Sequence, residues 1–441
     1  MNSAQTKLST EELVEALKEA RARTLELIAD LNHEQLMGPR LQIVNPLRWE
    51  IGHVAWFQEK WVLRHLGKAK PIIPEADSLY DSACVPHDSR WELPLPSRRE
   101  TFRYVQEVRD RVLDRLISIA PNAAEDYFHH LAVFHTGMHA EAFTYTRQTL
   151  GYSRPQLLVP PGRVHSEAAG TGSLPGDAEI PGGTYWLGAT PDLPFVFDNE
   201  KWAHPVPLRT FRIARAPVTN AEYASFVEEG GYQRREFWSD EGWIWREQSG
   251  ARHPVYWEHG SGGRWFRRSF DRWVALEDHH PIVHVNWYEA DAYCRWASRR
   301  LPAESEWEMA ASVNRLPDGR EREERKRTFP WGDELPSPDR AHLDFAGLSC
   351  IDVGFLSSGD SAFGCRQMIG NVWEWTSTDF DAYPGFVADP YKEYSQPWFG
   401  THKVLRGGCW ATGSRLIRNT WRNFYTADRR DVFAGFRTCV L

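Results

Sequence analysis

The sequence lacks the features that define several classes of protein. No apolar run approaches the roughly 18 residues that a membrane-spanning helix needs. Only six of the 441 residues are cysteine, none in C-x-x-C spacing, and the opening segment MNSAQTKLSTEEL holds no apolar signal stretch. These absences argue against a membrane protein and a disulfide-stapled scaffold, and they predict a reduced, cytoplasmic protein.

Basic residues are outnumbered by acidic residues. The chain has 52 Lys and Arg against 60 Asp and Glu, so its net charge is −8. No global positive field would gather a polyanion, and nucleic acid is not an expected partner. Apolar residues at 41% and charged residues at 25% are typical of globular proteins, and the length suffices for two or three domains.

Aromatic residues are abundant instead. There are 21 Trp, 15 Tyr and 22 Phe, and most of the tryptophans follow residue 180. Rings in such number must pack deeply, with their N–H and O–H groups satisfied, or line a ligand pocket.

The first third of the chain has a helical pattern. Ser9 and Ser97 are each followed three residues later by glutamate, which is the capping-box signature of a helix start. Residues 49–66 are apolar on nearly all sides, and a further helix is expected over 125–150. Four such helices predict a bundle that occupies residues 1–155.

A change of composition separates this region from the rest. Residues 156–176 are rich in Pro, Gly and Ser and predict a linker. Residues 177–441 consist of short aromatic segments between turn residues, with one clear helix near 287–298. This pattern favours a single irregular α+β domain.

Three histidines form the strongest candidate site. His135 and His139 are four residues apart on one predicted helix, so their rings leave the same face one turn apart. His53 lies in the apolar helix WEIGHVAWF, where an imidazole needs a partner. The set could bind Fe, Zn, Cu or Ni with coordination positions left open, or it could be a core cluster without a metal.

Neighbouring polar groups are weaker candidates. Glu141, His129 and His130 are expected to lie around the site or at the surface rather than to bind a metal. A carboxylate beside a metal-binding histidine could still orient its ring.

The motifs of the chain occur in a recognisable order. The N-terminal region resembles the DinB-like domain of the ergothioneine-type sulfoxide synthases in NPLRWEIGHVAWFQEKW, YDSACVPHDSRWELPLPSRRETFRYV and FHTGMHAE. The C-terminal region resembles the formylglycine-generating-enzyme fold, a relative of the C-type lectin fold, in IPGGTYWLGA, PVTNAEYASFV, PIVHVNWYEADAYCRWAS, RLPAESEWEMAA, GNVWEWT, VLRGGCW and FAGFR.

This resemblance implies a two-domain architecture, with an all-α DinB-like four-helix bundle followed by an α+β formylglycine-generating-enzyme domain that completes the substrate pocket. It also implies a non-haem Fe(II) held by His53, His135 and His139. The implied substrates are hercynine, dioxygen and a sulfur or selenium donor. The residues do not indicate an oligomeric state.

Further site residues follow from the same resemblance. The trimethylammonium group of hercynine accepts no hydrogen bonds, so aromatic faces and dipoles are its expected partners. The candidate substrate-binding residues are Arg90, Met138, Trp421, Asn423, Phe424, Arg429 and Arg430. Cys84 lies in the segment expected to face the site, although a thiol there could equally be inert.

Departures from the sulfur-using relatives affect the expected donor. Those relatives carry a catalytic tyrosine either in the loop after GNVWEWT or as a tyrosine pair before the third bundle helix. The first place holds Phe380, with Tyr383 three residues later, and the second holds Ala83 and Cys84, so Phe380 and Tyr383 are the candidate catalytic positions. A phenol can donate a proton whereas a phenyl ring cannot. The difference is similar to the selenoneine synthases, which join hercynine to 1-seleno-glucose.

Two other readings remain open. An ergothioneine-type enzyme would use cysteine or γ-glutamylcysteine, whose carboxylates Arg90 and Arg429 or Arg430 could bind. A lectin-like fold could also bind without catalysing a reaction. A formylglycine-generating enzyme itself is disfavoured, because Cys409 in RGGCW has no evident cysteine partner for copper.

Overall fold

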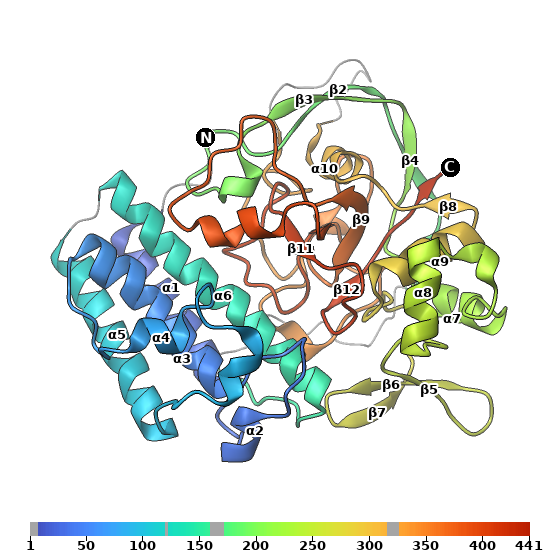
Figure 1. The fold of residues 1–441 in the computed structure, drawn as a ribbon. Coiled ribbons are helices and arrows are strands. Elements are labelled where there is room, and N and C mark those ends of the chain that lie inside the picture. Colours follow the sequence, from blue (N-terminus) through green and yellow to red (C-terminus); the bar gives the residue numbers. More distant parts are fainter. Residues whose placement is uncertain (1–7, 120–121, 159–171, 315–325) are drawn as a thin grey trace. The chain divides into compact units, whose positions relative to one another are not determined.

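The structure is a computed structural model, and it describes all residues except 1–7, 120–121, 159–171 and 315–325 (Figure 1). The chain divides into two compact units between Pro160 and Pro161. Much of the expected linker, residues 156–176, therefore lies outside the described residues. Each unit is described by itself.

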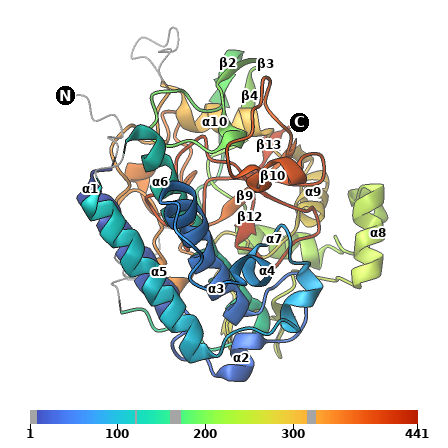
Figure 2. The same ribbon diagram turned by 60° about the vertical axis from the view of Figure 1, so that its left-hand side comes forward.

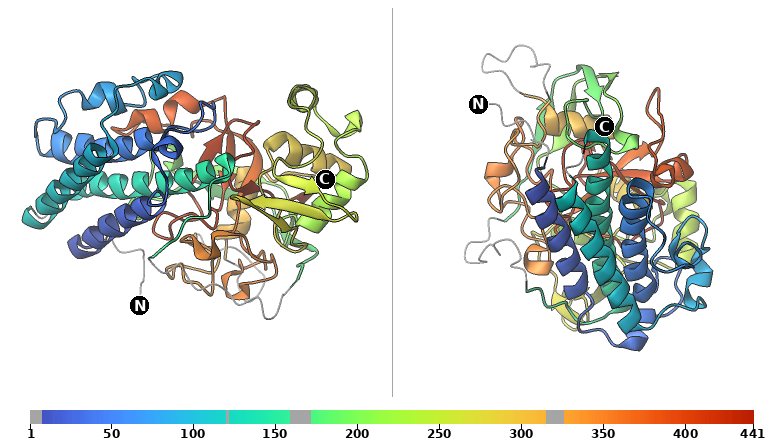
Figure 3. Two further views of the ribbon diagram at one scale, coloured as in Figure 1. Left: turned by 90° about the horizontal axis from the view of Figure 1, so that it is seen from below. Right: turned by 90° about the vertical axis from the view of Figure 1, so that its left-hand side faces the viewer.

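The N-terminal unit is a helical bundle, as predicted. Its α-helices are α1 (Thr10–Glu26), α2 (His33–Met37), α3 (Leu47–Gln58), α4 (Ala76–Tyr80), α5 (Arg98–Ser118) and α6 (Ala123–Leu150). A 3₁₀ turn, η2 (His87–Trp91), precedes α5. The long helices α1 and α3 each pack against both α5 and α6, so these four form the bundle (Figures 2 and 3).

The helix starts follow the sequence signals. The Ser9 hydroxyl accepts a hydrogen bond from Glu12 N, and the Glu12 carboxylate accepts one from Ser9 N. Ser97 and Glu100 make the same pair of bonds at the start of α5. Because both capping boxes satisfy backbone N–H groups that a helix start leaves open, they fix where α1 and α5 begin.

The helix expected over residues 49–66 changes type part-way. It is α-helical through α3 and then continues as a π-helix, η1 (Glu59–Leu66). Nearly every residue of α3 is buried, which agrees with its apolar pattern. The fully buried Glu59 accepts hydrogen bonds from Tyr104 Oη and from Ile72 N, so the π-helical segment is bonded to its surroundings in the bundle.

The C-terminal unit is the expected α+β domain. Its α-helices are α7 (Asn220–Glu228), α8 (Asp240–Ser249), α9 (Trp287–Trp296) and α10 (Glu304–Ser312). Its 3₁₀ turns are η4 (Asp198–Glu200), η5 (Arg235–Phe237), η6 (Ala346–Leu348), η7 (Ser357–Gly359), η8 (Lys392–Tyr394) and η9 (Gln396–Trp398).

The strands described in this unit are short and form four separate sheets. They are β1 (Asp177–Ile180), β2 (Gly183–Leu187), β3 (His204–Leu208), β4 (Phe211–Ala214), β5 (Trp257–His259), β6 (Trp265–Ser269), β7 (Arg272–Ala275), β8 (Arg299–Arg300), β9 (Trp373–Asp379), β10 (Lys403–Arg406), β11 (Asn423–Tyr425), β12 (Ala434–Gly435) and β13 (Cys439–Val440). The sheet orders are β1-β4-β13-β8, β11-β10-β9-β12, β2-β3 and β5-β6-β7 (Figure 1). All pairings are antiparallel except β12 with β9.

Buried ion pairs join these short elements. Arg437 Nε donates to Glu374 Oε2 at 2.6 Å, and Trp307 Nε1 donates to the same oxygen at 2.8 Å. Arg422 Nε donates to Glu304 Oε2 at 3.0 Å. These side chains are nearly inaccessible to solvent. Bonds of this kind hold the loop-rich fold together where regular strands are only two to seven residues long.

None of the described helices is long and apolar enough to cross a membrane.

Candidate metal centre

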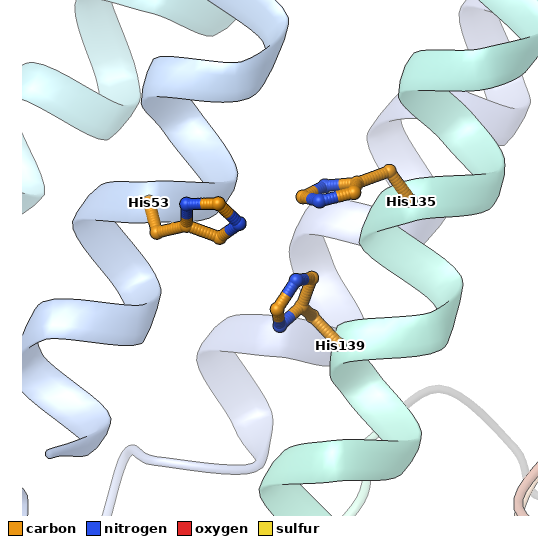
Figure 4. Close-up of side chains that lie close together, drawn as sticks. All are labelled: His53, His135 and His139. Carbon is orange, nitrogen blue, oxygen red and sulfur yellow. The ribbon is translucent and has the colours of Figure 1, made fainter. Parts of the chain in front are cut away.

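Three histidines of the bundle come together in space. His135 and His139 lie one turn apart on α6, and His53 faces them from α3 (Figure 4). One ring nitrogen of each lies within 4.8 Å of those of the other two. The ring centroids of His53 lie 5.1 Å from those of His135 and 5.0 Å from those of His139. Figure 4 shows the three rings pointing into a common space between the two helices.

Hydrogen bonds orient two of the rings. His53 Nδ1 donates to the carbonyl oxygen of Tyr80 at 2.7 Å, and His139 Nδ1 donates to Glu50 Oε1 at 2.6 Å. Carbonyl and carboxylate oxygens only accept, so the proton in each neutral imidazole is on Nδ1. The Nε2 lone pairs of His53 and His139 are therefore available for a metal.

Burial affects two of the three histidines strongly. His53 and His135 are each only 3% exposed. Desolvation, reinforced by the charge of neighbouring His139, holds the pKa of both rings well below the usual value for histidine. Neutral imidazole is the form that binds metals, so low pKa values at His53 and His135 suit a transition-metal site.

Aromatic rings surround the cluster. Phe57 stacks on His135 with centroids 3.6 Å apart and planes 6° apart. Trp49 stacks on His53 with centroids 5.0 Å apart, and Trp56 also stacks on His53, with centroids 5.6 Å apart. These stacked rings limit how the His53 and His135 imidazoles can rotate.

Arg90 contacts the ring of Trp49, which in turn stacks on His53. Its guanidinium carbon is 4.0 Å from the centroid of Trp49, the ring that also stacks on His53. Its Nη1 donates to Asn45 Oδ1 at 2.7 Å and its Nη2 to the carbonyl of Val85 at 3.2 Å. Burial lowers the pKa of Arg90 to about 10. Most of its donors are thus used within the bundle.

The other predicted residues of the bundle are not part of the cluster. Met138 is half-buried on α6, and Cys84 is an exposed free thiol. His129, His130 and Glu141 are buried rather than at the surface. The carboxylate that bonds His139 belongs to Glu50, not to Glu141.

In the C-terminal unit, several predicted residues meet in an aromatic cluster. Phe380 is fully buried and stacks on Phe424 with centroids 3.9 Å apart. Tyr394 meets Phe424 edge-on at 5.7 Å, and its hydroxyl accepts a hydrogen bond from Trp421 Nε1 at 3.4 Å. Phe380, Trp421 and Phe424 therefore share one neighbourhood.

Tyr383 and Phe380 both contact Arg422, a residue that the sequence analysis did not single out. The guanidinium carbon of Arg422 lies 4.1 Å from the Tyr383 ring and 4.8 Å from the Phe380 ring. The Tyr383 hydroxyl is buried and has no hydrogen-bond partner among the described residues. Burial also raises the pKa of Tyr383 well above its usual value, so it stays a neutral phenol.

The remaining polar candidates bond within their own unit. Asn423 Oδ1 accepts a hydrogen bond from Phe424 N at 2.8 Å. Arg429 makes a two-pronged contact with Asp431 at 2.6 and 2.7 Å. Arg430 Nη1 lies 3.7 Å from Glu289 Oε1. Both arginines are thus already paired with carboxylates.

Comparison with known proteins agrees with the two units. Residues 16–147 match the DinB superfamily, and residues 163–440 match the sulfatase-modifying factor enzyme 1-like domain. The chain is 37% identical to the hercynine oxygenase of Mycolicibacterium thermoresistibile, over 97% of this chain and 94% of that protein. It is also 37% identical to the hercynine oxygenase of Mycobacterium tuberculosis, over 97% of this chain and 98% of that protein.

The chain belongs to the hercynine oxygenase family. The expected fold class, a DinB-like bundle followed by a formylglycine-generating-enzyme domain, is confirmed. This is an oxidoreductase family, and the resemblance inferred from the motifs is correct at that level. The C-terminal part is also 31% identical to the formylglycine-generating enzyme of Streptomyces coelicolor, over 61% of this chain and 90% of that protein.

In this member of the hercynine oxygenase family, sequence reasoning did not identify Glu50 and Arg422 as residues near the predicted sites. Glu50 stands three residues before His53, on the same helix face. A lone carboxylate in an otherwise apolar helix was the available signal. Arg422 had no such signal, because its position between two aromatic rings depends on the fold of the loops.

Proposed function

We propose that this chain is a non-haem Fe(II), O₂-dependent enzyme that joins hercynine to 1-seleno-glucose through a C–Se bond. The observation that carries the proposal is the cluster of His53, His135 and His139, whose ligand atoms lie within 4.8 Å of one another, in a chain related to hercynine oxygenases along nearly its whole length. Three protein ligands leave coordination positions for dioxygen and for a soft donor atom.

In this proposal the bundle holds the metal and keeps its surroundings dry. His53, His135 and His139 supply the three nitrogen ligands. Iron, when bound, would activate dioxygen, the oxidant that bond formation at an unactivated imidazole carbon requires. Phe57 and Trp49 restrict the rotation of the ligands and exclude water from one side of the site.

The C-terminal aromatic cluster supplies suitable partners for hercynine. A trimethylammonium group is attracted to the faces of aromatic rings. Trp421 and Phe424 offer such faces, and Asn423 offers a polar contact for the rest of the substrate. Met138 is assigned to the substrate as the residue directly before His139.

The residues proposed to meet the chalcogen donor favour selenium over sulfur. Phe380 cannot donate a proton, and a selenolate, which ionises at lower pH than a thiolate, has less need of one. Arg429 and Arg430 already contact Asp431 and Glu289, which favours an uncharged sugar over a donor with carboxylates. Tyr383, with its buried and unpartnered hydroxyl, is the nearby group that could still hold a proton.

The alternative is a C–S bond to cysteine or γ-glutamylcysteine. Arg90 favours it, because its Nε is buried without a partner among the described residues and could meet a carboxylate. All six cysteines are free, which supports a reducing, cytoplasmic location for either reaction.

A competition experiment decides between the donors. The protein is loaded anaerobically with Fe(II) and then exposed to air with hercynine and equal amounts of 1-seleno-glucose, 1-thio-glucose, cysteine and γ-glutamylcysteine. Mass spectrometry should show the hercynine–selenium adduct in excess over every sulfur adduct. A dominant cysteine or γ-glutamylcysteine sulfoxide would establish the alternative instead.

The His135→Ala variant is the control for the metal. It should form no adduct and retain no stoichiometric iron, because only two ligands remain. An iron-free wild-type protein without activity would contradict the proposed function and favour a binding protein.

A further inference from the structure

Glu50 and His139 make a hydrogen bond between two helices. They are 89 residues apart in the sequence, Glu50 on α3 and His139 on α6, with Oε1 and Nδ1 2.6 Å apart. Glu50 is 1% exposed. A buried carboxylate is costly unless it is hydrogen-bonded, so this contact accounts for the presence of an acid in an otherwise apolar helix.

The three rings of the cluster are held by different means. His53 donates to a backbone carbonyl, which no side-chain substitution removes directly. His135 is stacked against Phe57. His139 is the least buried of the three, with 19% of its side chain exposed, and its described orienting contact is the carboxylate of Glu50.

We propose that Glu50 is a positioning residue for the metal centre. By accepting the Nδ1 proton of His139, it selects the tautomer whose Nε2 faces His53 and His135. It also places a carboxylate against one of three imidazole donors, which makes the bonded imidazole a stronger donor to a cation. The inference rests on the proposed function only in that the cluster binds a metal.

Two substitutions separate this role from simple packing. Glu50→Leu removes the acceptor while keeping an apolar side chain of similar length in the buried position. Glu50→Gln removes the charge but keeps an oxygen that can still accept from Nδ1. Glu59→Gln is the matched control, because it also neutralises a buried glutamate of the same helical run, and its hydrogen bonds go to Tyr104 and Ile72.

The first measurement needs no metal. In full-length protein labelled with ¹⁵N-histidine, the ring nitrogens report the tautomer by NMR. His139 should have its proton on Nδ1 in the wild type, in Glu50→Gln and in Glu59→Gln. Glu50→Leu should shift it toward Nε2–H. An unchanged tautomer in Glu50→Leu would overturn the proposal.

The second measurement is titration with Co(II), followed by its visible absorption. Glu50→Leu should lose roughly 10–100-fold in affinity, Glu50→Gln should lose less, and Glu59→Gln should remain within about twofold of the wild type. Equal affinities for the wild type and Glu50→Leu would refute the positioning role. A wild type that binds no Co(II) would instead count against the proposed metal centre, and the tautomer measurement would still decide the role of Glu50.

Discussion

The ring of Tyr80 lies directly against Gly52. A Cβ atom at position 52 would lie 2.2 Å from Cε1 of Tyr80, which is closer than non-bonded atoms approach. The same Tyr80 offers its carbonyl oxygen to His53 Nδ1. The absence of a side chain at Gly52 therefore allows the contact that orients the His53 ring.

Gly52→Ala should consequently damage both stability and metal binding. Displacing the Tyr80 ring should cost about 1–3 kcal/mol of unfolding free energy, as overpacking usually does. The accompanying shift of the carbonyl should weaken Co(II) binding roughly tenfold. Urea denaturation and metal titration measure the two effects. Gly413→Ala is the control, because its Cβ would meet nothing within 4 Å; equal behaviour of the two variants would contradict the steric argument.

Phe380→Tyr should change the preference for the donor. The new phenol would stand in the aromatic cluster beside Phe424, and a positioned proton donor commonly contributes 10²–10⁴-fold to a rate. The ratio of selenium to sulfur product should therefore fall by roughly tenfold or more in the competition assay. Phe399→Tyr, on the neighbouring ring 5.0 Å away, should leave the ratio unchanged. A ratio that does not move in Phe380→Tyr would remove this residue from the selectivity argument.

Arg437→Met should strongly destabilise the C-terminal unit. It leaves the carboxylate of Glu374 buried with Trp307 as its remaining side-chain donor, and breaking a buried ion pair in this way typically costs about 3–5 kcal/mol. Chemical denaturation followed by tryptophan fluorescence measures the loss. The double variant Arg437→Met with Glu374→Leu should regain part of it, because no charge is left unpaired. A double variant less stable than the single one would show that packing, not charge, dominates.

His284 should make the protein less stable in mild acid. Burial, with the charges of Arg267 and Arg268, lowers the pKa of His284 to about 3 in the folded state, against about 6.5 when unfolded. Between these values the unfolded chain binds a proton that the folded chain does not, so stability falls as the pH drops from about 6.5 to about 3.

The variant His284→Asn tests this titration. Position 284 has a φ of 64°, a conformation that asparagine tolerates and in which it does not titrate. The difference in unfolding free energy between pH 7 and pH 5 should be smaller in His284→Asn than in the wild type. The same difference in both proteins would exclude His284 as a source of the acid sensitivity.

Local signals in the sequence were sufficient to predict the bundle and the grouping of its three histidines. The capping boxes at Ser9 and Ser97 fixed helix starts, and the four-residue spacing of His135 and His139 placed two rings on one helix face. His53 was predicted because an imidazole in an apolar helix needs a polar partner. The π-helix from Glu59 to Leu66 did not follow, because it differs from an α-helix in hydrogen bonding rather than in pattern.

Contacts between residues far apart in the sequence could not be predicted from local patterns. The bond from His139 to Glu50 and the placement of Arg422 between Phe380 and Tyr383 each depend on how separate segments meet. The pairing of Arg429 with Asp431 is local, yet the chain also offers Asp428 as a neighbour of opposite charge. Spacing alone does not choose between those two acids.

The positions of the three histidines also have a consequence for folding. The first ligand lies on α3 and the last on α6, so 85 residues between them form one closed loop whenever a single ion binds all three. An ion held this way acts as a cross-link, and any affinity it has for the folded bundle over the unfolded chain is added to the stability of the bundle. If the cluster holds an ion as proposed, removing that ion would also remove a cross-link between two helices of the N-terminal unit and so lower its stability.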